Sequence, residues 1–365
     1  MAQGAAGQIA LAKLNSLYAN VNTVNLWTNF VSESLEHKFA ELEEGAITGS
    51  RDAPFSFQGI ESIDGDVAIE PYPGPLSHYL RAWFGSAVHS TVTAAASTGA
   101  NSGTFAGHPQ VYHRYTPNQS AFDSRCFLDP YNVMVYRDVG SAWLYKGVII
   151  PTLKFDFTAG QLVKATVSMM GRQGDRIQRT NGISAFVSSG GGPWVWDMTS
   201  VEVSTSDTTS AGLAAFTNFE QLSMTLTMPH DGVVFLDGTK RYGEFSPSDF
   251  RRVNIEGTMS FRDHLAYEAF KNYTNLRMRL TMMNVNSQYS LGNVASLNAA
   301  GFLGYPGLRF HIPNMKFLSW SAPIPGPTRL QAKFTAKAQY DSTAGASIIA
   351  DLLNNINSVD IETAY

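Results

Sequence analysis

The sequence predicts a mainly β (α+β) fold in which one β-rich unit occurs twice, each time with one short flanking helix. The first observation is a repeated motif, in which Trp27-Thr28-Asn29-Phe30 returns as Phe216-Thr217-Asn218-Phe219. The second is a proline motif, in which Ile150-Pro151-Thr152-Leu153-Lys154-Phe155 is echoed by Ile312-Pro313-Asn314-Met315-Lys316-Phe317. Runs of alternating apolar and polar residues follow both proline motifs, as is typical of half-buried strands. Landmarks in the same order indicate a duplicated unit.

A strand that begins at glycine and runs into a short helix is the next shared feature. Gly65-Asp66-Val67-Ala68-Ile69 precedes a predicted helix over 76–84, and Gly257-Thr258-Met259-Ser260-Phe261 precedes one over 262–272. In the first helix, Leu76, Tyr79, Leu80 and Trp83 fall at i, i+3, i+4 and i+7. This spacing gives one apolar stripe that suits burial on a sheet.

The remaining elements of the first half follow from periodicity and turn residues. Residues 5–20 place Ile9, Leu11, Leu14 and Leu17 near helical spacing, which predicts a short amphipathic helix or a docking arm. Alternation from Leu35 to Leu42 predicts a strand, and the polar stretch 45–54 that follows predicts a loop. Val133–Tyr136 and Ala142–Tyr145 predict a hairpin.

The second half repeats this plan. We expect strands at 219–228, 252–261, 275–285, 312–321 and 328–339, with a loop at 237–249. The C-terminal tail places Ile348, Ile349, Leu352 and Leu353 at a spacing that predicts one or two helical turns.

These elements divide the chain into five segments. We expect an N-terminal helix or arm (1–20), a first unit (21–172) with an insertion at about 85–130, a linker (173–211), a second unit (212–340) and a C-terminal tail (341–365). The insertion is rich in turn-forming residues and has no counterpart in the second half.

Composition excludes several classes of function. The chain has 365 residues, a net charge of −4 and 15% charged residues, without a Lys/Arg run dense enough to read nucleic acid. A single cysteine, Cys126, excludes an intrachain disulfide and favours a reducing compartment. The N-terminus lacks signal-peptide features, and no apolar stretch reaches the ~20 residues that span a bilayer. We expect assembly in the cytoplasm and no membrane anchoring.

No catalytic, cofactor or metal site is expected. His108 and His113 have no further ligand beside them at metal-binding spacing. The glycines at 189–192 lack the Lys-Ser/Thr of a phosphate loop, so they indicate a hinge. Glu41, Glu43 and Glu44 sit at the entry to a loop, where solvation is more common than acid–base work. Scattered tryptophans favour core packing over a sugar-binding platform.

Three segments carry a resemblance to a known family. They are Ser34-Leu35-Glu36-His37, the Gly65 strand with its helix ending in Trp83-Phe84-Gly85, and Glu256-Gly257-Thr258-Met259-Ser260-Phe261. The chain resembles the tail tube proteins of long-tailed bacteriophages, in particular the larger type with two tube domains in one chain. The resemblance covers about residues 25–170 and 212–340, and the 85–130 insertion departs from a bare tube unit.

The resemblance implies a structural protein of the virion tail, not an enzyme. Each unit would be a β-sandwich or small barrel, and three copies would form a pseudo-sixfold ring. Stacked rings would conduct DNA without reading it, through a channel with acidic or neutral walls. The implied partners are the tail terminator, tape measure and distal tail proteins. Loops 45–54 and 237–249 would reach the next ring, with Arg51, Asp52, Lys240 and Arg241 as candidate stacking contacts.

Two alternatives stay open at this point. Another duplicated β-rich virion protein, such as a capsid or decoration subunit, would share the composition but close into shells. A carbohydrate-binding or hydrolytic β-sandwich would need an aromatic platform or convergent carboxylates.

Overall fold

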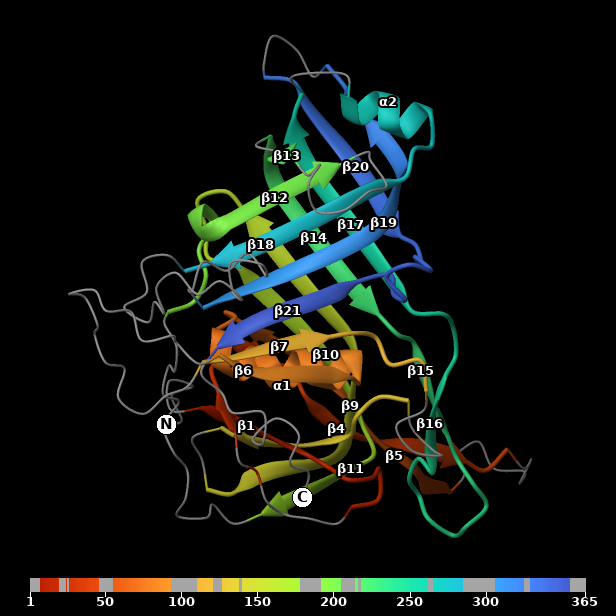
Figure 1. Cartoon of the computed structure of the whole chain (residues 1–365). Coiled ribbons are helices and arrows are strands. Elements are labelled where there is room, and N and C mark those ends of the chain that lie inside the picture. Colours follow the sequence, from red (N-terminus) through yellow and green to blue (C-terminus); the bar gives the residue numbers. More distant parts are fainter. Residues whose placement is uncertain are drawn as a thin grey trace, which may run out of the picture.

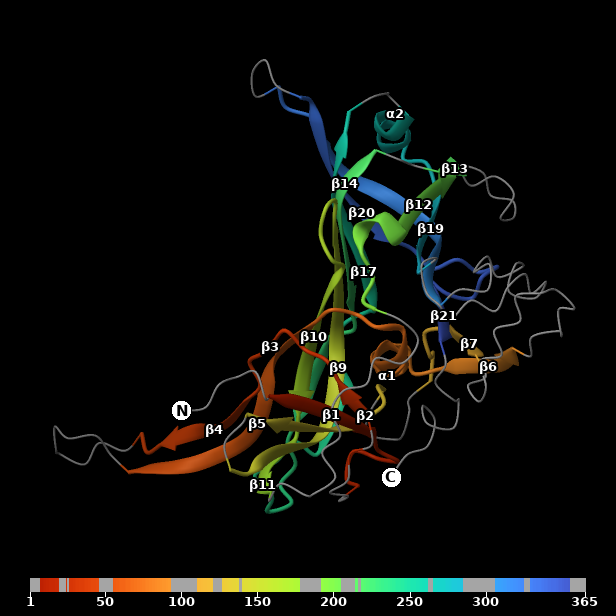
Figure 2. The ribbon, with the colours of Figure 1, turned by 90° about the vertical axis from the view of Figure 1, so that its left-hand side faces the viewer.

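The structure, a computed structural model, is mainly β, as the sequence predicts (Figure 1). Turning it by 90° shows that α1, β6, β7 and β21 lie on one side of the long strands β9 and β17 (Figure 2). None of the helices described is both long and apolar enough to cross a membrane. The structure describes residues 7–19, 24, 26–45, 55–92, 110–120, 127–137, 140–177, 192–204, 214–215, 218–261, 265–284, 306–324 and 329–354.

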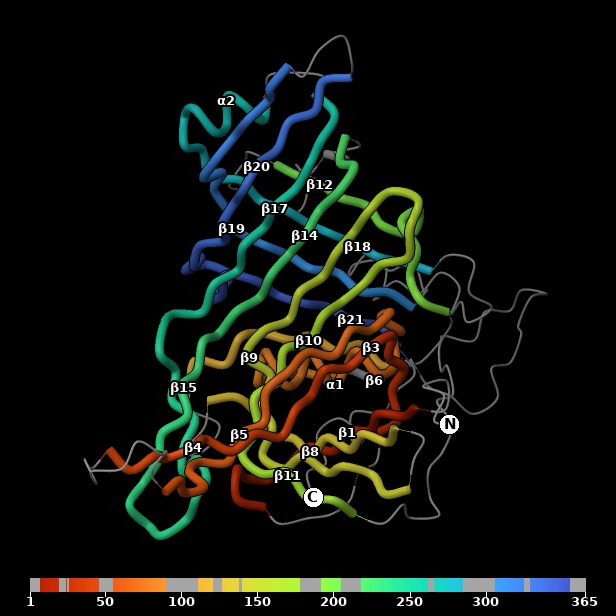
Figure 3. The backbone as a smooth tube through the Cα atoms, turned by 180° about the vertical axis from the view of Figure 1, so that it is seen from behind, coloured from red at the N-terminus to blue at the C-terminus, as the bar shows by residue number. Residues whose placement is uncertain are grey.

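A long antiparallel sheet, here called the common sheet, runs through both halves of the chain (Figure 3). From one edge to the other it contains β3 (Ser32–Glu33) and β4 (Glu36–Glu43), then β5 (Ser56–Ile69), β10 (Lys164–Gly171), β9 (Ala142–Thr158), β14 (Phe219–Thr227), β17 (Arg252–Ser260), β20 (Gln331–Ala338) and β19 (Gly307–Ser321). Its central strands β10, β9, β14, β17 and β20 alternate between buried apolar and more exposed polar side chains, so one face packs on the core and the other is polar.

Two strands bend out of the common sheet into smaller ones. The first part of β9 joins a sheet with β2 (Leu26–Thr28), β1 (Gln8–Lys13), β8 (Tyr131–Tyr136) and β11 (Gln173–Ile177). The first part of β19 joins β13 (Ala214–Ala215), β12 (Thr199–Ser204), β18 (Leu276–Met283), β21 (Ile349–Asn354), β7 (Gln110–Tyr115) and β6 (Ala87–Val92). Pro151 and Pro313 stand where β9 and β19 change sheets. Because proline cannot donate to a ladder, it suits such a corner.

The same series of strand pairings therefore occurs twice. The series β2–β1–β8–β9–β10–β5 matches β13–β12–β18–β19–β20–β17 pair by pair. In the first half, β11 pairs with the first part of β9. In the second half, β21 pairs in the same way with the first part of β19. We call β1–β11 the first half and β12–β21 the second half.

Each half contains one α-helix, after the strand predicted to precede it. α1 (Pro73–Phe84) begins with proline, which suits the first turn of a helix, and ends at Gly85 in the left-handed conformation. Every residue of α1 is buried, because it packs against β9 on one side and β21 on the other. α2 (Leu265–Lys271) packs on β19. A 3-10 turn, η2 (Trp196–Met198), precedes β12.

One apolar core extends across both halves. It contains side chains from α1, α2 and both bent strands, and the rings of Phe155 and Phe310 lie 5.1 Å apart across it. Trp83 and Trp194 are fully buried in this core, in agreement with the packing role expected for them.

Most predicted elements are confirmed. β14, β17, β18 and β20 lie within the predicted strands, and the predicted strand 312–321 is the second part of β19. β8 and β9 form the predicted hairpin, with Val133 opposite Tyr145.

A helix is wrong in two segments, of which the N-terminal one was predicted as either a helix or a docking arm. Residues 8–13 form β1, and residues 349–354 form β21. In both segments, at least four consecutive residues are buried. In β1, Ile9 and Leu11 pack in the main core on one face, and Ala10 packs in a second apolar cluster on the other face. A continuous apolar run of this kind fits a fully buried strand as well as it fits a helix.

Strands also occur in segments that the sequence predicted as connections. β11 and β12 lie in the expected linker at 173–211. β16 (Glu244–Pro247) lies in the expected loop at 237–249 and pairs with β15 (His230–Val233).

Candidate assembly surfaces

The two halves join by direct strand pairing. β9 and β14 pair from Thr152 opposite Thr227 to Thr158 opposite Gln221. The first half thus offers the edge of β9, and the second half offers the edge of β14. This junction makes one continuous sheet from two similar sets of strands, five in the first half, where β3 and β4 share one edge of β5, and four in the second.

The insertion that has no counterpart in the second half bridges the two halves. Its strands β6 and β7, the bridging hairpin, add to the edge of β21. Arg114 donates to both carboxylate oxygens of Asp351 at 2.8 and 3.2 Å, which raises the pKa of Arg114, and Tyr112 donates to Asp351 at 2.6 Å. His113 contacts Asn354 at 2.8 Å. The sequence left the role of this segment open.

A second hairpin, β15–β16, belongs to the second half and packs on the first half. We call residues 230–247 the docking hairpin. A small apolar cluster lies beneath it, in which Met228 and Phe245 from the second half contact the first half. Its buried members from the first half are Leu17, Leu128 and Ile149. Burial of apolar surface is the main stabilising contribution at this contact.

A buried carboxylate, Glu61, holds the loop of the docking hairpin. Its side chain accepts a hydrogen bond from Arg241 Nε at 3.0 Å and one from the Gly174 amide at 2.8 Å. His37 Nε2 lies 2.9 Å from the same carboxylate. The Glu61 amide donates to the Lys240 carbonyl at 2.7 Å. A buried carboxylate with this many partners fixes the position of the loop.

The predicted stacking residues therefore divide into two groups. Lys240 and Arg241 lie in the docking hairpin, and both contact Glu61 of their own chain. Arg51 and Asp52 lie outside the described residues. Sequence reasoning missed Glu61, although a carboxylate at an inward position of β5, between Gly59 and Ile63, was a usable signal.

Arg172 and Tyr18 make a further contact with the docking hairpin. Arg172 donates to the Tyr242 carbonyl at 2.6 Å, and its guanidinium lies 4.2 Å from the centre of the Tyr18 ring. The Tyr18 hydroxyl donates to the Gly243 carbonyl. Burial lowers the pKa of Arg172.

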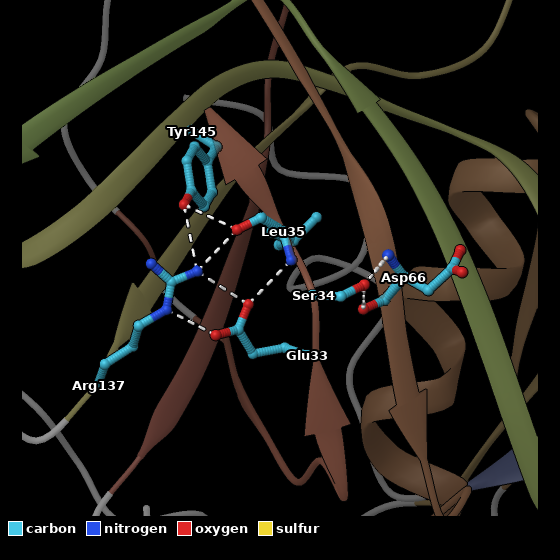
Figure 4. A network of polar contacts seen from close by, with 6 residues as sticks. All are labelled: Glu33, Ser34, Leu35, Asp66, Arg137 and Tyr145. Atoms are coloured by element: carbon cyan, nitrogen blue, oxygen red, sulfur yellow. Dashed lines mark hydrogen bonds and ion pairs between the residues drawn. The ribbon is translucent and has the colours of Figure 1, made fainter. Parts of the chain in front are cut away.

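The outermost strand of the first half is held in shape by a polar network (Figure 4). Glu33 accepts two hydrogen bonds from Arg137, at 2.6 and 3.0 Å, and these raise the pKa of Arg137. Arg137 also donates to the Leu35 carbonyl at 2.7 Å, and the Leu35 amide donates to Glu33 at 3.0 Å. The network ties the β3–β4 connection to the end of β8.

Gly65 lies directly opposite this connection. It has a φ of +151°, and a Cβ there would lie 2.5 Å from the Ser34 carbonyl oxygen. Ser34 is bound to the next residue of β5, because its hydroxyl oxygen accepts a hydrogen bond from the Asp66 amide at 3.0 Å (Figure 4). The Ser34 amide donates to the Asp66 carbonyl at 2.9 Å. Glycine therefore lets the outer strand approach β5 closely.

The common sheet has open edges at both ends. Among the described residues, β4 pairs only with β5, and β19 from Lys316 onward pairs only with β20. Leu318 forms a bulge at this edge, because Phe317 and Ser319 pair with successive residues of β20. Unpaired edges attract further strands, so natural proteins cover, shorten or pair them.

The described residues contain no group of three His, Cys, Asp or Glu side chains that could hold a metal ion. His113 is buried against His89, whereas His108 and Cys126 lie outside the described residues. Glu41, Glu43 and Glu44 are all exposed to solvent.

Comparison with known proteins points to one family. A family model described as phage tail tube protein matches residues 4–347, nearly the whole chain. A comparison with curated proteins gave no match.

Proposed function

Because the chain belongs to the phage tail tube protein family, we propose that it forms closed rings that stack into the DNA-conducting tube of the virion tail. Membership makes it a structural component of the virion tail. Ring size, stacking contacts and DNA delivery are parts of the proposal.

The observation that supports ring formation is the junction between β9 and β14. Within one chain, the last common-sheet strand of the first half pairs with the first strand of the second half. The second half ends in the corresponding strand, β19, with an open edge, and the first half begins with the open edge of β3 and β4. Repeating the junction between copies pairs β19 of one copy with β3 and β4 of the next. Such a head-to-tail contact is heterologous and produces a closed ring when the rotation permits.

We propose three copies in each ring. Each copy supplies two similar halves, so three copies give six units and a pseudo-sixfold ring. The exposed side of α2 supports the same arrangement. α1 is covered on its second side by β21, whereas α2 keeps an exposed side with Tyr267 and Glu268. In a ring, the first half of the next copy would cover that side.

The polar face of the common sheet is the proposed wall of the channel. Its central positions are Ser, Thr, Asn and Gln side chains, with lysines and carboxylates interleaved, as in the ion pair of 3.1 Å between Lys154 and Asp156. Mixed charge gives weaker retention of phosphates than a dense Lys/Arg lining would. The residues assigned to this face on the four central strands are Thr152, Lys154, Asp156, Thr158, Lys164, Thr166, Ser168, Gln221, Ser223, Thr225, Thr227, Asn254, Glu256 and Thr258.

Stacking would use the two loops at one end of the strands. We keep Arg51, Asp52 and Lys240 as candidate contacts with the next ring. Arg241 is a weaker candidate, because its guanidinium already pairs with Glu61. Tail terminator, tape measure and distal tail proteins would meet the ends or the channel of the finished tube, after assembly in the host cytoplasm.

Electron microscopy and mass measurement of the purified chain test this function. We expect tubes, and a smallest closed species with the mass of three chains. In the variant Leu318→Pro, the bulge keeps the lost amide out of the β20 ladder, so the fold should persist while rings disappear. Leu236→Pro, in the exposed loop of the docking hairpin and away from the open edges, is the control. Shells instead of tubes, or unchanged rings with Leu318→Pro, would refute the proposal.

A further inference from the structure

The two halves use the same connection in different ways. The segment between β14 and β17 folds into the docking hairpin and packs on the preceding half. The outer parts of β4 and β5 hold the same position in the first half. The first half has no preceding half within its own chain, and the described residues do not bury the apolar side chains of these outer parts.

The β4–β5 segment instead projects from the molecule as a two-stranded ribbon, formed by Glu36–Glu43 and Ser56–Glu61 (Figure 2). Leu42 pairs with Phe57 across the ribbon, and their exposed fractions are 57% and 63%. Phe55, two residues before Phe57 and therefore on the same face, is 78% exposed. The opposite face is polar, with Glu41 opposite Gln58.

An exposed apolar face of this kind marks an interaction surface. A ribbon with one apolar and one polar face is built to be covered on one side only. Two-stranded ribbons are marginal in water without such a cover.

The docking hairpin shows what covers the equivalent segment. It contacts the first half at β5 through Glu61, at the β9 bend through Ile149, and at the β10–β11 connection through Arg172. The matching elements of the second half are β17, the β19 bend and the β20–β21 connection.

Two of these matching elements of the second half, the start of β17 and the β20–β21 connection, have exposed aromatic side chains. Phe250, just before β17, is 85% exposed, and Tyr340, in the β20–β21 connection, is 63% exposed. Within the described part of the chain, nothing packs over either ring well enough to bury it.

We propose that the apolar face of the ribbon packs on the second half of another copy in the same ring, over Phe250 and Tyr340. This contact repeats between copies what the docking hairpin does within one copy. It rests on the proposed ring, and it assigns the apolar face of the ribbon, unlike the proposed stacking residues Arg51 and Asp52, to a neighbour around the ring and not to the ring above.

Disulfide trapping in assembled tubes distinguishes these two neighbours. The full chain carries Leu42→Cys and Tyr340→Cys, with Cys126→Ser to remove the native thiol. After mild oxidation, a contact within the ring closes covalently at three chains, so bands should stop at the trimer. A ladder that continues beyond the trimer would mean that the ribbon reaches the next ring, and it would overturn the proposal. An absence of cross-links would also overturn it.

A matched control uses Leu42→Cys with Val88→Cys in the same background. Val88 is exposed on β6, in the bridging hairpin, and does not belong to the proposed surface. We expect no covalent trimer from this pair. An equal yield of trimer would show that the trapping is unspecific, and the assignment would fail.

A second measurement uses single substitutions on the two faces of the ribbon. Phe57→Ser should raise the concentration needed for half-assembly at least tenfold by mass photometry, whereas Gln58→Ser should leave it unchanged. Unchanged circular dichroism shows that each variant folds. If the unsubstituted chain forms rings and Phe57→Ser assembles equally well, this inference alone is refuted. If the unsubstituted chain forms no rings, the proposed function fails together with it.

Discussion

Phe245 in the docking hairpin gives the sharpest test of how the two halves are held together. Its ring is fully buried among Leu17, Leu128 and Ile149 of the other half. Complete burial of such a side chain contributes about 1.5–3 kcal/mol by transfer alone. The cavity left after truncation adds to this loss, so Phe245→Ala should lower the free energy of unfolding by about 3–5 kcal/mol. The Tyr242 ring, 5.5 Å away, would lose its aromatic partner as well.

Urea unfolding followed by circular dichroism measures this loss, at concentrations too low for ring formation. Phe250→Ala is the matched control, because Phe250 lies five residues further along and is mostly exposed. We expect the control to stay within about 0.5 kcal/mol of the unsubstituted chain. The loop of the docking hairpin should also become cleavable by protease in Phe245→Ala and not in Phe250→Ala. Equal stability of the two variants would refute the inference that the docking hairpin joins the halves.

Three further predictions follow from the described contacts. Gly65→Ala should destabilise the chain by clearly more than Gly160→Ala, as measured by urea unfolding. A Cβ at Gly65 would lie 2.5 Å from the Ser34 carbonyl oxygen, whereas a Cβ at Gly160 meets no atom within 4 Å. Gly160→Ala therefore costs only the roughly 1 kcal/mol of a left-handed backbone. Burial lowers the pKa of the His230 imidazole below its usual 6.5. As the pH falls, the imidazole therefore takes up a proton in the unfolded chain before it does so in the folded chain, and stability should decrease on acidification from pH 6.5 down to the lowered pKa. His230→Asn should flatten that part of the pH–stability curve. Asp351→Asn replaces the buried carboxylate of the bridging hairpin by a neutral amide, which loses the negative charge and one of the two acceptor oxygens. It should cost about 1–2 kcal/mol by urea unfolding, a value reduced because Arg114 is half exposed; a loss below 0.5 kcal/mol would contradict the bridging role.

Local pattern in the sequence was sufficient for the fold class and for most elements. Alternation predicted β14, β17 and β20, and the apolar stripe from Leu76 to Trp83 predicted α1. The repeated Ile-Pro motifs predicted a duplication, and both prolines lie where a long strand changes sheets. These features are readable because strand and helix periodicities are set by the side chains of the segment itself.

Only the tertiary structure decided which segments meet. Residues 8–13 and 349–354 are strands because neighbours cover both of their faces, and a short buried run has no period of its own that excludes a helix. The bridging hairpin and Glu61 join partners more than 100 residues apart, so no local pattern announced them. Sequence by itself therefore determined the fold class of this tail tube protein and its clearly periodic segments. Long-range packing determined the short buried strands and which surfaces remain open for other copies, because edges become free or paired only when the whole chain has folded.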